Sequence, residues 1–173
     1  MALAAYTKTC ESNNGGGSKL YFIAKDDVTS FTLKTGSQYY DTMTLGSGKL
    51  FYEYDFEEYT AQLTPVMEGV QGATKWTHTL MFNMSALSDE QRTGLVNLIE
   101  ENPCGLIGIF VDNNDRKWVL GYDEKDDGDH PLKVTSGAGD SKMDLLEPSE
   151  MVVTMVCINR EQCREFVGTV TIT

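Results

Sequence analysis

The sequence lacks any run of about 18 apolar residues, so we expect no membrane-spanning helix and no membrane partner. Its start, Met1 to Tyr6, has no basic segment followed by an apolar one, which argues against a secretory signal peptide. The four cysteines show no short repeated spacing and are predicted to be reduced thiols rather than a disulfide framework. These absences favour synthesis in the cytoplasm.

Positive charge is scarce. Fourteen lysine and arginine residues stand against 26 aspartate and glutamate residues, which gives a formal net charge of −12. Because nucleic-acid binding depends on basic side chains that displace counterions from phosphates, this composition argues against specific recognition of DNA or RNA. Repulsion is nevertheless useful in a channel through which DNA has to slide.

Motifs for catalysis and ligand binding are also missing. Gly15 to Lys19 is rich in glycine but lacks the P-loop spacing, and no serine lies in a G-x-S-x-G turn. Cys157 and Cys163 are six positions apart, which matches no zinc or redox motif. His78 lies on an apolar face and is interpreted as a core histidine rather than a ligand. We therefore predict that the protein is not an enzyme and has no catalytic residue, no cofactor and no metal.

The acidic segment from Asp123 to His130 comes nearest to a metal-binding loop. With Gly128 at the sixth position of an EF-hand loop, Asp123 fits the first position. Lys125 and Val134 stand where an oxygen ligand and the bidentate glutamate are needed, so the pattern fails twice. A solvated acidic loop is the favoured interpretation.

What the chain contains suits a single domain over residues 1–173, with a flexible N-terminal segment over 1–18. Its 173 residues are 40% hydrophobic and 10% aromatic, which is enough for one core. A helix is predicted at about residues 88–102, because Ser88 and Gln91 fit a capping box and Pro103 ends the pattern. Strands are predicted at residues 19–24, 28–34, 49–57, 75–84, 105–111, 117–122, 151–158 and 165–173, and turns at 112–115 and 137–140. The fold class is mainly β: a β-sandwich or partly closed barrel with one flanking helix.

Three carboxylates, Glu53, Asp55 and Glu57, alternate with Tyr52, Tyr54 and Phe56. In a strand such residues share one face at a spacing of about 7 Å, so the carboxylates repel one another. A solvent-exposed sheet face explains them simply. A channel lining that does not hold DNA phosphates is the functional alternative, and these three are the candidate lumen-facing residues.

Two predicted strands, Leu106–Val111 and Met151–Ile158, are apolar on both faces. A two-layer sandwich covers only one face of each strand, so both need a second cover. We expect the helix to cover one of them and a neighbouring copy of the chain to cover the other, which indicates self-assembly.

The segment Gly105-Leu-Ile-Gly-Ile-Phe-Val-Asp-Asn-Asn-Asp-Arg-Lys-Trp-Val-Leu-Gly-Tyr122 resembles part of the structural proteins of phages and prophages of Bacteroides-type bacteria. The Leu87–Glu90 helix start before it and the early Asp27–Leu33 stretch are similar too, so that the resemblance covers about Tyr21 to Thr154. The family often has Asn-Gly in the hairpin turn where this chain has Asn114-Asp115, so the turn type is open.

The resemblance implies a virion component of the tail-tube type, or a head-to-tail connector ring such as the crAss-like phages carry. The expected partners are copies of the chain in a ring, other phage tail, neck or head proteins, and genomic DNA that passes without specific binding. The expected location is the virion, assembled in the host cytoplasm. The alternative is a capsid-decorating protein or a host-glycan-binding module, in which Tyr39, Tyr40 and Tyr59 are possible sugar platforms.

Overall fold

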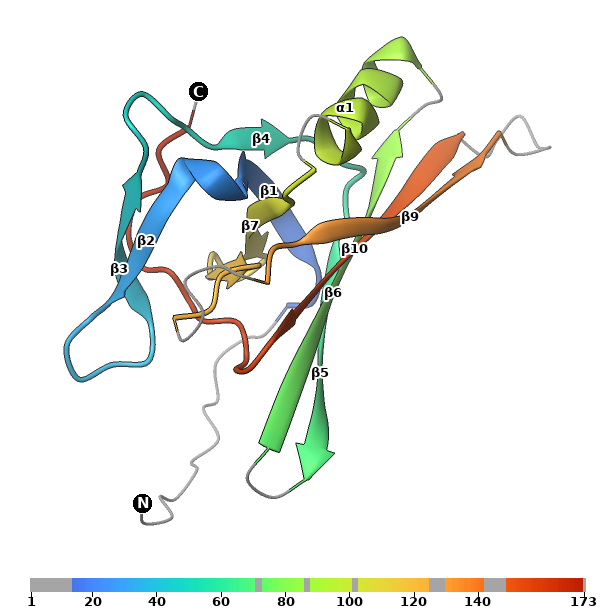
Figure 1. The fold of residues 1–173 in the computed structure, drawn as a ribbon. Coiled ribbons are helices and arrows are strands. Elements are labelled where there is room, and N and C mark those ends of the chain that lie inside the picture. Colours follow the sequence, from blue (N-terminus) through green and yellow to red (C-terminus); the bar gives the residue numbers. More distant parts are fainter. Residues whose placement is uncertain are drawn as a thin grey trace.

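The computed structural model describes residues 14–70, 73–85, 88–100, 103–124, 130–141 and 149–172. Within these ranges the chain is mainly β, with one α-helix (Figure 1). The elements in chain order are β1 (Gly17–Ala24), the short 3-10 helix η1 (Lys25–Asp27), β2 (Val28–Leu33), β3 (Tyr40–Leu45), β4 (Tyr52–Tyr54), β5 (Gln62–Val70), β6 (Ala73–Ser85), α1 (Asp89–Ile99), β7 (Leu106–Asp112), β8 (Lys117–Leu120), β9 (Lys133–Asp140) and β10 (Glu150–Asn159).

The strands form three antiparallel sheets in layers. The central sheet has the order β4-β1-β7-β8, and the order β5-β6-β10-β9 makes a longer sheet on one side of it. The pair β2-β3 lies on the other side (Figure 1). The predictions of a mainly β fold with one helix are confirmed. None of the described sheets closes on itself, so the partly closed barrel is wrong.

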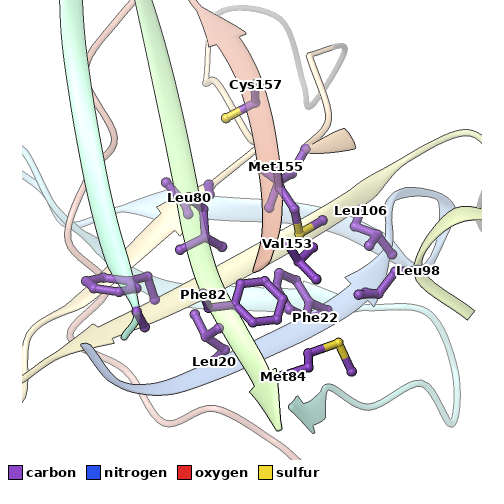
Figure 2. Packing of buried hydrophobic residues seen from close by; sticks show 14 residues of the cluster. Leu20, Phe22, Leu80, Phe82, Met84, Leu98, Leu106, Val153, Met155 and Cys157 are labelled. Atoms are coloured by element: carbon purple, nitrogen blue, oxygen red, sulfur yellow. The ribbon is translucent and has the colours of Figure 1, made fainter. Parts of the chain in front are cut away.

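Alternation along the central sheet divides the core in two. In β1, Leu20 and Phe22 belong to a first cluster, whereas Tyr21 and Ile23 belong to a second. The first cluster lies between the central sheet, the β5-β6-β10-β9 sheet and α1 (Figure 2). The second packs against β2-β3 and against Phe166 of the C-terminal segment. A sheet with a core on each face needs apolar residues at every position, which explains the continuous apolar runs of β1 and β7.

The second cover of β7 therefore comes from its own chain. All six residues from Leu106 to Val111 are buried. The odd-numbered residues belong to the second cluster, and Leu106 and Phe110 belong to the first. Of the two strands expected to need a cover from the helix or a neighbouring copy, β7 needs neither for its second face, because the β2-β3 layer, which was not foreseen, covers it. In β10, by contrast, only alternate residues are buried, and Ile158 is 46% exposed.

Helix α1 begins as predicted, with the Ser88 hydroxyl accepting a hydrogen bond from the Gln91 backbone N–H at 3.2 Å. It ends at Ile99, and residues 101–102 of the predicted helix lie outside the described residues. Leu98 is buried against the first cluster, whereas Ile99 is half exposed.

Other boundaries differ from prediction. The expected turn at residues 137–140 is the end of strand β9, where Gly137 pairs with Val153. The predicted strand over 165–173 forms only isolated bridges, such as Phe166 with Tyr40 and Ile172 with Phe51. In the β7–β8 hairpin, Asp115 adopts a left-handed backbone conformation (φ 61°) and its N–H donates to Asp112 O at 3.1 Å. The turn is therefore a three-residue loop that ends in a left-handed residue.

Candidate functional site: surfaces available for assembly

The acidic stripe is only partly formed. Strand β4 ends at Tyr54, so Glu53 lies in the strand and Asp55 and Glu57 lie in the segment after it. Glu53 Oε1 forms an ion pair with Lys19 Nζ at 3.2 Å. Both residues line a shallow hollow of about 260 Å³ together with Asp55. Glu57 is partly buried and does not line this hollow.

The hollow contains another carboxylate, Glu58, which the period-two pattern did not identify. The predicted alternation of buried aromatic and exposed acidic residues fails at the start of this segment. Phe51 is fully buried in the second cluster, and Tyr52, expected on the buried face, is 59% exposed. Of the predicted aromatic face, Tyr54 and Phe56 pack against the first cluster, whereas Tyr52 does not. The structure thus brings Glu53, Asp55 and Glu58 together, exposed, beside the edge of the central sheet.

The three tyrosines proposed as sugar platforms have different environments. Tyr40 is 1% exposed, and burial raises its pKa, so it belongs to the core and cannot contact a ligand. Tyr59 is 84% exposed, and Tyr39 is half-buried with the Lys34 ammonium 5.4 Å from its ring centroid. Tyr40 is therefore a wrong candidate, whereas Tyr39 and Tyr59 are accessible.

His78 has the structural role that its apolar neighbours predict. Its Nε2 accepts the backbone N–H of Cys163 at 2.9 Å, and its Nδ1 lies 3.3 Å from Asn159 Oδ1. With Nε2 as acceptor, the proton is on Nδ1 and the ring is neutral. Burial lowers the pKa of His78, in agreement with the neutral form. The imidazole thus joins β6 to the segment that follows β10.

Two cysteines that contact this histidine, Cys157 and Cys163, hold their thiols in the protonated form. Burial raises the pKa of Cys157 and that of Cys163 to about 12, so neither forms a thiolate near neutral pH. Cys104, Cys157 and Cys163 are free thiols, and Cys10 lies outside the described residues.

The acidic loop of the failed EF-hand pattern is described only in part, because residues 125–129 lie outside the described residues. Asp123 is buried, and its Oδ2 accepts the Arg160 backbone N–H at 2.8 Å. Its carboxylate therefore holds the chain after β10.

In the described part of the chain, no group of three or more His, Cys, Asp or Glu side chains is placed to hold a metal ion. No described helix is long and apolar enough to cross a membrane.

Three exposed apolar side chains lie close together at the end of the β5–β6 hairpin. We call residues 65–70 and 73–76 the arm. Val66, Met67 and Val70 are 45%, 58% and 74% exposed. Neighbours in a strand point to opposite faces, so Val66 and Met67 expose the two faces of the ribbon. Figure 1 shows the arm extending beyond the other layers, at the end of the molecule opposite α1 and β4.

The β5-β6-β10-β9 sheet also has a solvent face and two unpaired edges. In β6, residues facing away from the core include Thr77, Thr79 and Met81, and in β10 they include Val156 and Ile158. Strands β5 and β9 are the outermost strands, and no described segment pairs with their outer edges. Sequence patterns missed this surface because β5 was not predicted as a strand.

Comparisons with protein-family models, with curated proteins and with solved structures found no match to this chain, so the features above are the observations on which a function has to be argued.

Proposed function

We propose that the chain is a virion structural protein that forms oligomeric rings of a phage tail tube or head-to-tail connector, through which DNA passes. The arm carries this proposal, because its exposed apolar side chains on two faces call for a cover that the described part of the chain does not supply. The resemblance of Gly105–Tyr122 to phage structural proteins gives the biological setting.

The arm is a two-stranded ribbon, which is only marginally stable in water without packing. One exposed ion pair, Lys75 Nζ to Glu68 Oε2 at 2.8 Å, links its strands, and such a pair contributes about 0–1 kcal/mol. Burying Val66, Met67 and Val70 against another copy would stabilise the contact by about 25 cal/mol for each Å² of apolar surface removed from water. We take the partner to be another copy of the chain, because most soluble oligomers are built from identical subunits.

The two unpaired edges suit a ring. Strand β5 of one copy and strand β9 of the next are different surfaces, so a contact between them is heterologous and closes into a ring when the rotation allows it. Edge pairing also satisfies backbone groups that an exposed edge leaves to solvent. In such a ring the solvent face of this sheet, with Thr77 and Thr79, forms one wall.

The charge of the chain fits a conduit. A net charge of −12 opposes tight contact with DNA phosphates. The exposed carboxylates Glu53, Asp55 and Glu58 lie beside the central sheet rather than on the β5-β6-β10-β9 face. The pore wall is therefore either the acidic hollow or the threonine-bearing face, and charge substitutions can tell the two apart.

The test is assembly of the purified chain at high concentration, viewed by negative stain and sized by sedimentation. We expect rings or tubes from the natural sequence, and loss of them in the triple variant Val66→Ser, Met67→Ser, Val70→Ser. The matched control is Tyr59→Ser with Val167→Ser, which removes exposed apolar groups outside the arm. A natural sequence that stays monomeric, or a triple variant that assembles normally, contradicts the proposal.

The location of the protein in a particle separates the tube from the alternatives. Tail or neck fractions of purified virions should contain the chain. Its recovery with heads instead would indicate a capsid-decorating protein with the same β architecture.

A further inference from the structure

We propose that a groove across Trp118 binds a neutral oligosaccharide. Two adjoining hollows, of about 330 and 360 Å³, share Trp118, Gln162 and Cys163 along their walls. Each is within the range of about 300–1,000 Å³ that small-ligand sites occupy. We call the pair the Trp118 groove; this proposal does not depend on ring assembly.

The indole of Trp118 is partly buried against the first cluster and lines both hollows. Its Nε1–H donates to Asp112 Oδ2 at 3.2 Å, so the polar atom of the ring is satisfied within the chain. The other oxygen of Asp112 accepts the backbone N–H groups of Asn114 and Arg116 at 2.8 and 3.0 Å, which fixes the carboxylate. A ring whose orientation is set before binding loses little conformational entropy when a flat apolar face of a sugar packs on it.

Side-chain amides surround this platform. Gln62 and Gln162 are exposed and line the hollow on the Asp112 side, and Gln38 and Tyr39 line the other. An amide offers two donors and an acceptor on one plane, which matches neighbouring sugar hydroxyls that both donate and accept. An aromatic face with several amides around it is therefore suited to a polyhydroxylated ring.

The charges of the groove indicate a neutral ligand. Three carboxylates, Asp112, Glu161 and Glu165, line it against one guanidinium, that of Arg164. Two nitrogens of Arg164 are engaged, since Nη2 pairs with Glu161 and Nη1 donates to Gln38 Oε1 at 2.7 Å, whereas its buried Nε has no hydrogen-bond partner among the described residues. A sulfated, phosphorylated or sialylated glycan, or a nucleic acid, would meet net repulsion here.

The chain contains two tryptophans, which allows a direct test. In the variant Trp76→Phe, Trp118 is the only remaining tryptophan and therefore the only fluorescent indole. The replaced residue, Trp76, stacks on His78. The full-length variant is titrated with neutral hexoses, N-acetylhexosamines and their short oligomers up to millimolar concentration, and with anionic sugars and an extended peptide for comparison. We expect a saturable change in Trp118 emission with at least one sugar.

Gln162→Ala in the same background should weaken that binding about tenfold, through loss of hydrogen bonds to the ligand. Tyr59→Ala is the control, since Tyr59 is an exposed aromatic residue outside the groove, and it should bind as before. If Trp76→Phe does not fold, saturation-transfer NMR on the natural sequence replaces fluorescence. The absence of binding across the panel, equal affinity in Gln162→Ala, or a response to anionic sugars or extended peptides alone overturns the proposal.

Discussion

Strand β7 and the arm are at opposite extremes of burial. Every residue from Leu106 to Val111 is buried, between two clusters of its own chain, whereas Val66, Met67 and Val70 are exposed on a ribbon that extends past the other layers. The sequence of β7 is the more apolar, yet it is the arm that is left open. Apolar character on both faces of a strand therefore indicates a central layer, and the surface that we propose for another copy lies where a strand extends past the layers.

The largest effect that tests this contrast is on β7. Ile109→Ala removes a side chain that is 1% exposed in the second cluster and should lower the free energy of unfolding by about 3 kcal/mol. Val66→Ala in the arm should change it by less than about 0.5 kcal/mol. Urea denaturation of both variants, at a concentration where the chain is monomeric, measures the difference. Similar losses in the two variants would show that the arm is part of the monomer's core.

The helix and the strands with strong patterns could be predicted, because Ser88 and Gln91 cap locally and residues 75–84 alternate cleanly. Strand β5 could not, since Pro65 and Gly69 disfavour a strand and pairing with β6 overrides them. The turn expected at Gly137 failed for the same reason: β10 pairs with these small residues and holds them extended. The second cover of β7 could not be foreseen either, because it is built from Phe31, Tyr40 and Phe166, which are far apart in sequence.

The candidate surfaces were only partly predictable. Glu53 and Asp55 are exposed in one hollow as the stripe suggested, but Glu57 leaves it because the strand ends at Tyr54. The arm and the Trp118 groove gave no local signal, since each depends on which strands extend and which loops meet. Only tertiary structure places Gln162 beside Trp118.

A smaller effect should come from His78, at the junction of the long sheet and the segment after β10. Burial lowers its pKa in the folded chain, while an unfolded histidine titrates near 6.5. Below that pH the unfolded chain takes up a proton that the folded chain does not, so stability is full above pH 6.5 and falls as the pH decreases. The loss is at most about 1.4 kcal/mol per pH unit.

His78→Gln should remove this component between about pH 5 and 6.5, where few carboxylates titrate. Thermal unfolding across that window, compared with the natural sequence, measures it. The thiols of Cys157, whose Sγ lies 3.9 Å from His78 Nδ1, and of Cys163, whose backbone N–H donates to the ring, stay protonated in this range and do not contribute. An unchanged slope in His78→Gln would mean that the imidazole is charged in the folded state.

The smallest effect on stability, and the most informative for function, should come from charges on the two possible pore walls. Glu53→Lys, Asp55→Lys and Glu58→Lys together change exposed groups of the acidic hollow, so the monomer should lose little stability beyond the exposed pair with Lys19. Thr64→Lys with Thr79→Lys places two positive charges on the solvent face of the long sheet, where the two threonines pair across β5 and β6. Both variants should still assemble, but only the one whose lysines face the pore should retain DNA and reduce infectivity. Loss in the threonine variant alone would place the wall on the sheet with open edges, and loss in the acidic variant alone would place it at β4. Full infectivity in both variants would contradict the proposed passage of DNA, but it would leave the proposed contact of the arm with another copy to the assembly experiment.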